Sequence, residues 1–243
     1  MKSKDGRPVA KSIDEIHYRV IDLVRDFPAG KALDFPCGWG RLSCWLAELG
    51  HTVTSCDRNV ELFPDSSIHP IRADLNGTIP FPDGTFDYAF CIDGPEHSEN
   101  LYHTFREFYR VLKRNGKFVL SMPNYSNIES RIKQLFYGVV EPVTSRENFR
   151  KSRIGTGAFH LNRPSYPLLR MALEAADFSV RSATYDKKKD KQKFLYPLYL
   201  VIRLFTYCKG EKGQVKYGLR YGNHKNVLMG GNTLIVLAQK DSD

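Results

Sequence analysis

The sequence predicts an α/β fold with a doubly wound, mostly parallel sheet, and three observations support this prediction. Short apolar runs alternate with amphipathic helical patterns, an order that produces a parallel sheet covered by helices on both faces. The first apolar run ends in an acid followed by two glycines, at the point where such a sheet binds ligands. The 243 residues, 42% of them hydrophobic, can bury one sizeable core.

The elements are predicted from periodicity and from the residues that flank them. Apolar residues at three- and four-residue spacings follow Ser12 and Glu15, which predicts an amphipathic helix with a capping box. We expect strands at 31–35, 52–56, 86–92 and 117–122, a short strand before Asp74, and helices at 41–49, 100–112 and 128–136. A further helix and strand follow over 165–186, and a last strand over 232–240.

One main domain is expected over residues 1–243. We divide it into an N-terminal helix at 12–30, a ligand-binding core at 31–125, a lid or cap at 126–165 and a C-terminal part at 166–243 with a basic insertion at 187–225. The cap segment is rich in loop residues, which suits a cover over the carboxyl ends of the strands.

The net charge of +9 comes from one segment. Residues 181–225 hold twelve Lys and Arg against three acids, whereas the rest of the chain has 24 basic and 24 acidic residues. An anionic partner is therefore expected at the C-terminal insertion and not at the main domain.

Several classes of protein are not expected from the composition. The longest apolar run, 194–207, is interrupted by Pro197 and Arg203 and is too short to cross a bilayer as a helix. The N-terminus lacks the apolar segment of a signal peptide, and the five cysteines have no C-x-x-C spacing that would indicate zinc or a disulfide framework. We expect a cytoplasmic protein, peripheral to a membrane if the insertion contacts lipid.

The glycine motif after the first strand argues against a dinucleotide. The fingerprint G-x-G-x-x-G requires a third glycine, whereas this chain has Gly38, Gly40 and then Ser43. Asp34, four residues before Gly38, would repel a pyrophosphate, but its carboxylate suits a ligand that carries an ammonium group.

Two further acids follow the next strands. Asp57 ends the second strand, 17 residues after Gly40, where a carboxylate accepts hydrogen bonds from both ribose hydroxyls. Asp74 follows a third short strand and is placed to receive an adenine amino group. An ammonium group, a ribose and an adenine without phosphates together describe S-adenosylmethionine.

These residues carry a resemblance to class I S-adenosylmethionine-dependent methyltransferases. The first motif is LDFPCGWG at 33–40, the second acid is Asp57, and the segments ADLNGTIPFPDGTFDYAFCID and VLKRNGKFVLSMPN resemble the later motifs. The resemblance implies a Rossmann-like fold with a seven-stranded sheet and a small cap. It also implies that the cofactor contacts Asp34, Pro36, Cys37, Gly38, Gly40, Asp57, Arg58, Asp74, Leu75 and Ile92. Pro36 departs from the family, which has a glycine there.

The segment CIDGPEHSENLYHTF follows the fourth strand and borders the expected position of the methyl group. Methyl transfer needs alignment and, for an alcohol acceptor, a base. We expect His97, or His160 from the lid, to serve as the base or to orient the substrate. A purely structural role for these histidines is the alternative.

A divalent metal is a further alternative, although it is not expected. The segment is similar to the E-x-x-E-H pattern of ubiquinone-pathway O-methyltransferases and small-RNA 3′-end methyltransferases. In that similarity Asp93, Glu96 and His97 are the candidate ligands, and His160 is the downstream histidine that completes the set.

The acceptor is expected to be a small molecule or a glycan- or lipid-linked compound, because the C-terminal half resembles methyltransferases of bacterial cell-surface glycan and lipid pathways. O-methylation of a sugar or glycolipid precursor is the first hypothesis. RNA methylation, or cofactor binding without catalysis, are the alternatives. The lysines and aromatic residues over 187–207 are consistent with membrane-surface contact, with nucleic acid binding, or with simple packing on the domain.

Overall fold

The computed structural model describes residues 14–62, 69–143, 145–147, 150 and 160–241. Its described part contains a seven-stranded sheet with the order β3-β2-β1-β4-β5-β7-β6. The strands are β1 Lys31–Asp34, β2 Thr52–Asp57, β3 Ile71–Arg72, β4 Phe86–Ile92, β5 Leu112–Pro123, β6 Phe178–Tyr185 and β7 Thr233–Lys240. Neighbouring strands from β3 to β5 are parallel, and β7 is antiparallel to both β5 and β6. The mostly parallel, doubly wound sheet is therefore confirmed.

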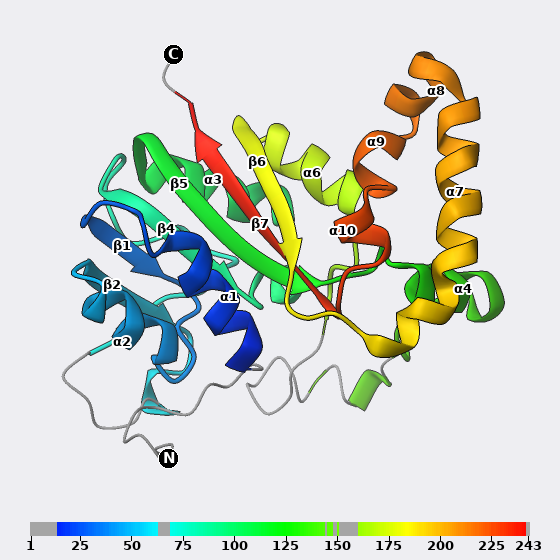
Figure 1. Cartoon of the computed structure of the whole chain (residues 1–243). Helices are drawn as coiled ribbons and strands as arrows, with labels where there is room; N and C mark the ends of the chain where they lie inside the picture. Colours follow the sequence, from blue (N-terminus) through cyan, green and yellow to red (C-terminus); the bar gives the residue numbers. More distant parts are fainter. Residues whose placement is uncertain (1–13, 63–68, 144, 148–149, 151–159, 242–243) are drawn as a thin grey trace.

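Helices cover both faces of this sheet (Figure 1). One layer holds α1 Asp14–Val24 and α2 Arg41–Glu48, and the other holds α3 Leu101–Val111 and α6 Tyr166–Glu174. Successive strand residues pack into opposite layers: Ala32 lies in the cluster with α1 and α2, and Leu33 lies in the cluster with α3. Because both faces are covered, successive residues of the central strand β4, such as Ala89, Phe90 and Cys91, are all buried and apolar, as is typical of parallel strands.

The elements of the core agree with their predicted positions, with two differences. The fifth strand begins at Leu112, earlier than the predicted 117, because Leu112 already pairs with Phe86 before an irregularity in the register. The first helix begins at Asp14, and Ser12 of the predicted capping box lies outside the described residues. Glu15 forms an ion pair with Lys187.

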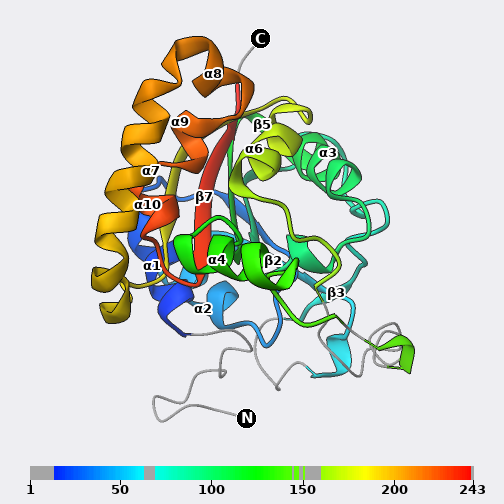
Figure 2. The same ribbon diagram turned by 90° about the vertical axis from the view of Figure 1, so that its right-hand side faces the viewer.

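The C-terminal insertion is helical. After β6 the chain forms a 3₁₀ turn, Asp190–Leu195, and then α7 Tyr196–Cys208, α8 Gly210–Lys216, α9 Leu219–Gly222 and α10 Lys225–Leu228. Figures 1 and 2 show α7 along one flank of the domain, outside α9 and α10, with α4 Ile128–Tyr137 on the same side. In the described residues, the helices are too short or too polar to cross a membrane.

Candidate cofactor and acceptor site

The order of the strands gathers the predicted site residues along one edge of the sheet. The chain runs from β1 outward to β2 and β3, then returns to place β4 on the other side of β1. In open α/β sheets, ligands bind at the carboxyl ends of the strands where the order reverses in this way. Asp57 ends β2, Asp34 ends β1 and Ile92 ends β4, so three predicted residues lie on neighbouring strands.

The loop after β1 is built around glycines with positive φ. Gly38 has φ 54° and Gly40, which precedes α2, has φ 82°, a region that side chains with a Cβ rarely adopt. The backbone N–H of Gly38 donates to Asp57 Oδ2 at 2.9 Å, and that of Asn59 donates to Asp57 Oδ1 at 2.9 Å. A carboxylate offers about four lone-pair positions, so Asp57 keeps acceptor capacity for two ribose hydroxyls.

Asp34 lies at the base of this loop, almost fully buried. Its Oδ2 accepts a hydrogen bond from Ser43 Oγ at 2.5 Å, and Ser43 Oγ lies 2.7 Å from Ser55 Oγ. Burial, opposed by the hydrogen bond from Ser43 and assisted by the charge of Asp57, raises the pKa of Asp34 to about 7. A neighbouring cation would stabilise its charged form, so the predicted ammonium contact remains a prediction with a measurable consequence.

The other predicted cofactor contacts lie around this centre. Ala73 N–H donates to the carbonyl of Asp57 at 3.1 Å, which brings the exposed Asp74 beside the second strand. Leu75 is partly buried against the core, Arg58 is exposed, and the backbone N–H of Cys37 donates to Cys56. Burial raises the pKa of the Cys37 thiol, so this thiol stays neutral within the loop after β1.

The ring of Pro36 packs closely against Gly94 on the neighbouring loop. A Cβ added to Gly94 would lie 2.5 Å from Cδ of Pro36 and 2.7 Å from Sγ of Cys91, distances that real contacts essentially never show. The proline ring therefore occupies space that only a glycine at 94 leaves open, and the loops after β1 and β4 pack tightly. Pro36 is thus a consistent part of this loop pair.

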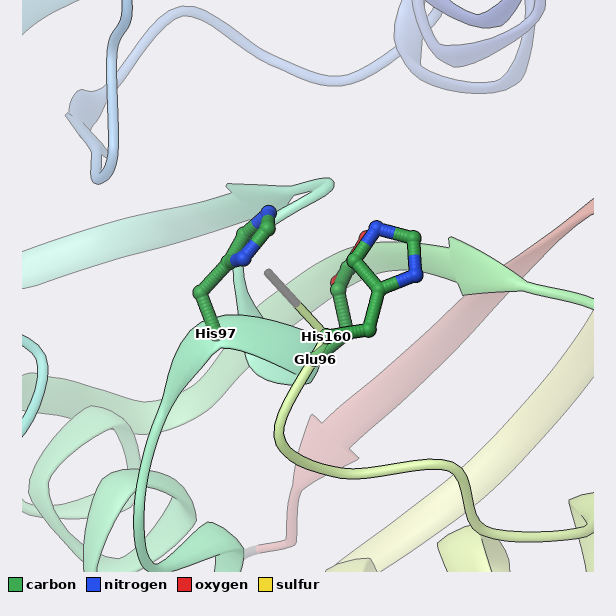
Figure 3. A group of neighbouring side chains, drawn as sticks. All are labelled: Glu96, His97 and His160. Carbon is green, nitrogen blue, oxygen red and sulfur yellow. The ribbon is translucent and has the colours of Figure 1, made fainter. Parts of the chain in front are cut away.

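A group of titratable side chains lies beside this loop pair. Glu96 and His97 come from a short 3₁₀ helix after β4, Pro95–His97, and His160 comes from the segment before α6. One ligand atom from each of the three lies within 4.8 Å of the others, and the two imidazole rings are 5.2 Å apart. Figure 3 shows the three side chains converging from the two segments.

Backbone hydrogen bonds hold the two segments together. The carbonyl of Glu96 accepts from the N–H groups of Leu161 at 2.7 Å and Asn162 at 3.0 Å, and the Asn162 amide donates to the carbonyl of Ser98. His160 is therefore positioned by its immediate neighbours and not by its own contacts alone.

The orientation of His160 is set by a carboxylate. Nδ1 of His160 lies 3.1 Å and 3.0 Å from the two carboxylate oxygens of Glu141, and 3.0 Å from the hydroxyl of Tyr125. Arg163 Nε lies 3.2 Å from Oε2 of Glu141. If Nδ1–H donates to Glu141, the lone pair is on Nε2, which is the arrangement of a general base held by an acid.

Glu96 differs from its neighbours. Its side chain is almost fully buried, and Oε2 has no hydrogen-bond partner among the described residues. Burial, with help from the nearby charges of Asp93 and Glu141, raises the pKa of Glu96 well above its usual range. Asp93 is close enough to act on Glu96 through its charge, but its Oδ1 accepts a hydrogen bond from Ser121 Oγ at 2.7 Å and it is not part of the three-residue group. His160, and not Asp93, is thus the third member of the group that the structure brings together.

Sequence reasoning missed Tyr125, Glu141 and Arg163. Tyr125 follows the end of β5, so its place at the carboxyl edge was a usable signal. Glu141 and Arg163 lie in irregular segments without periodicity, where the sequence gives no such signal. Tyr18 of α1 is 57% exposed, and its ring centroid lies 4.8 Å from that of Trp45.

The sheet order and the glycine loop define a class of protein. Solved structures of S-adenosylmethionine-dependent methyltransferases have the same fold: one from Archaeoglobus fulgidus superposes with a TM-score of 0.58 and 18% identity, covering 94% of this chain and 95% of that one. Residues 33–120 thus match the family model described as a methyltransferase domain, and the fold of the chain is similar to that of solved S-adenosylmethionine-dependent methyltransferases.

Sequence relatives share this domain. A sterol methyltransferase-like protein of Botryococcus braunii is 32% identical over 139 residues, which are 51% of this chain and 35% of that protein. A sterol 4-C-methyltransferase of Caenorhabditis elegans is 26% identical over 127 residues, 48% of this chain and 38% of that protein. The chain thus spans little more than a third of the length of these curated relatives.

Replacing Asp57 tests the ribose contact. We expect Asp57→Ala to weaken S-adenosylmethionine binding by about 1–3 kcal/mol, because a bidentate acceptor is lost, as measured by isothermal titration. Asp83→Ala is the matched control, since Asp83 is exposed and pairs with Arg110 away from this loop. Unchanged affinity in Asp57→Ala would refute the contact.

The ammonium contact of Asp34 predicts a pH dependence. Because the cofactor ammonium favours the charged carboxylate, affinity should rise roughly tenfold per pH unit below the pKa of about 7 and then level off. In the free protein the raised pKa of Asp34 has the opposite effect on stability. The folded state keeps a proton that the unfolded state has lost, so the free energy of unfolding falls as the pH rises from about 4 to 7.

Titrations at several pH values with Asp34→Asn as the comparison separate these effects. The variant should lose the pH dependence of cofactor binding over this range. A wild-type affinity that is flat with pH would exclude Asp34 as the ammonium partner.

Proposed function

We propose that this protein transfers a methyl group from S-adenosylmethionine to a hydroxyl group of a hydrophobic small molecule or lipid-linked acceptor, with His160 as the base. The observation that carries the proposal is the Glu141 and Tyr125 contact to Nδ1 of His160, beside the loops that hold the cofactor. A sugar or glycolipid precursor remains the preferred acceptor.

In this reaction the acceptor oxygen attacks the methyl carbon in line with the departing sulfur. The new O–CH₃ bond forms as the S–CH₃ bond breaks, and the sulfonium becomes the neutral thioether of S-adenosylhomocysteine. The hydroxyl proton passes to Nε2 of His160, and Glu141 stabilises the imidazolium that results. The protein otherwise contributes alignment of the two reactants.

Two considerations bear on the acceptor. Relatives are named for sterols, squalene and botryococcene, which favours a hydrophobic molecule. His160, which is oriented by the carboxylate of Glu141, suits an acceptor group that loses a proton during the reaction. A hydroxyl on a lipid or lipid-linked compound satisfies both. Methylation at carbon, which the names of several relatives state for those proteins, is the alternative for this chain.

The other hypotheses have different signatures. An RNA methyltransferase would label RNA, and a protein that only binds the cofactor would give titration heat but no product. The tight fit of Pro36 against Gly94 supports an ordered cofactor loop, so catalysis is preferred over binding alone.

The test is a methyl-transfer assay with radiolabelled S-adenosylmethionine on separated lipid, glycan and RNA extracts, followed by mass and NMR analysis of the product. We expect label in the lipid or glycan fraction as an O-methyl group. His160→Gln should lower kcat by roughly 10²- to 10⁴-fold without changing cofactor affinity, and Glu141→Gln should lower it less. His69→Gln is the control, because His69 is exposed and outside this group.

The outcomes separate the parts of the proposal. A C-methyl product would contradict the proposal of a hydroxyl acceptor but not the proposal of methyl transfer. Label confined to RNA would exclude the lipid and glycan acceptors. Full activity in His160→Gln would remove His160 as the base.

A second candidate role for the same group is divalent metal binding. Two imidazoles and a carboxylate form a donor set that first-row divalent metals accept, and the unpartnered Oε2 of Glu96 is the observation that favours it. Such an ion would act as a Lewis acid on the acceptor oxygen. The Glu141 contact would then orient His160 as a metal ligand.

We expect chelation to leave the activity within about twofold of its starting value, because a proton on the buried Glu96, whose pKa is raised, competes with a cation. The measurement is methyl transfer after dialysis against a chelator, together with titration of Mn²⁺ or Zn²⁺ by calorimetry. The metal role would replace the base if chelation abolished the activity and added Mg²⁺ or Mn²⁺ restored it in the wild type but not in Glu96→Gln.

A further inference from the structure

Helix α7 faces the solvent with its apolar side chains. Of the thirteen residues Tyr196–Cys208, Thr206 alone is buried. The apolar residues Leu198, Leu200, Val201, Leu204, Phe205 and Tyr207 are between 39% and 81% exposed. A surface helix normally turns its apolar stripe to the core and its polar residues to water, whereas α7 leaves most of its apolar side chains exposed.

Polar contacts fix this orientation. Thr206 Oγ1 accepts a hydrogen bond from Nδ2 of the buried Asn223 at 2.7 Å, and Arg203 donates to the carbonyl of Asn223 at 3.4 Å. Asn223 in turn accepts from Arg131 of α4 at 2.7 Å. The side of α7 that carries Thr206 and Arg203 is therefore attached to the domain through these hydrogen bonds, and rotating the helix about its axis would break them.

The neighbouring helix α4 extends the apolar surface. Its last residues, Leu135, Phe136 and Tyr137, are 76% to 78% exposed. Figure 2 shows α4 and α7 on the same side of the molecule, and Arg131 and Thr206 share Asn223 as a partner. The exposed residues of α7 and the end of α4 together form what we call the flank surface.

Basic and aromatic residues border the apolar part of the flank surface. Residues 187–216 contain nine Lys and Arg and two acids. Lys193 precedes α7, and Lys209, Lys212 and Lys216 follow it, all four with exposed side chains. Phe194 and Tyr217 flank the helix, 87% and 59% exposed. Aromatic residues at the ends of an apolar segment are typical of the membrane interface.

We propose that the flank surface binds an anionic lipid bilayer, with α7 lying in the plane of the membrane. Apolar side chains would enter the acyl boundary while the lysines contact anionic head groups, the arrangement of interfacial helices. At thirteen residues α7 is about 20 Å long, short of the ~30 Å hydrocarbon core, so it lies on the membrane and does not cross it. A second copy of this chain is disfavoured as the occupant, because it would bring two strongly basic segments together.

The proposal does not depend on the methyl-transfer activity, because it concerns binding alone. The experiment is co-sedimentation of the full chain with vesicles of phosphatidylcholine, and with vesicles of phosphatidylcholine mixed with phosphatidylglycerol. We expect binding to the mixed vesicles, weakened by salt. Leu200→Ser with Leu204→Ser should reduce the partition coefficient at least roughly tenfold.

The matched control is Leu168→Ser with Met171→Ser, which removes two apolar side chains of similar exposure, 52% and 48%, from α6. This variant should bind like the wild type, and circular dichroism checks that both double variants stay folded. Lys209→Gln, Lys212→Gln and Lys216→Gln should together lower binding to anionic vesicles by roughly fivefold per lysine.

Three results would overturn the proposal. The first is absence of binding to the mixed vesicles. The second is binding that needs the lysines but not the leucines, which would show charge attraction without insertion. The third is a protein that does not bind vesicles, is a dimer by light scattering, and dissociates when Leu200→Ser is combined with Leu204→Ser. This result would assign the flank surface to a second copy.

Discussion

The parallel pairing of β1 between β2 and β4 is the constraint on which the rest of the site depends. Both neighbours present their carboxyl ends at the same edge as β1, so Asp57, Asp34 and the loop after Ile92 meet there. Because adjacent strands lie only about 4.8 Å apart, each strand end contributes to the same small volume. The helices on both faces bury the strands that hold this geometry.

That convergence creates an unusual density of acids with few cations beside them. Burial and mutual repulsion raise the pKa values of Asp34, Asp93 and Glu96. A site of this kind is stabilised when a positive charge enters, which is the property a sulfonium cofactor with an ammonium group supplies. The same electrostatics therefore relate the proposed cofactor end of the site, at Asp34, to the proposed acceptor end, at Glu96 and His160.

The C-terminal insertion shows a second use of buried polar groups. Asn223 links α4 to α7 through hydrogen bonds with Arg131 and Thr206, and these bonds hold an apolar helix with its apolar side outward. An unsatisfied buried amide would cost about 1–3 kcal/mol, so these hydrogen bonds contribute to the orientation of α7. The domain thus has a polar site at the sheet edge and an apolar surface on its flank.

The sequence by itself determined the strands, the glycine loop and the positions of the candidate cofactor acids at the strand ends, because these depend on local periodicity and on the fixed order of a doubly wound sheet. It also identified His97 and His160 as candidates. Only the tertiary structure decided that His160 joins Glu96 and His97, that Glu141 and Tyr125 orient it, and that Asp93 turns to Ser121 instead. Periodicity shows that a segment is helical or apolar, but which side of α7 lies on the domain was visible only in the contacts of Thr206 and Arg203 with Asn223. Contacts between residues far apart in the chain carry no local pattern, which is why they required the folded molecule.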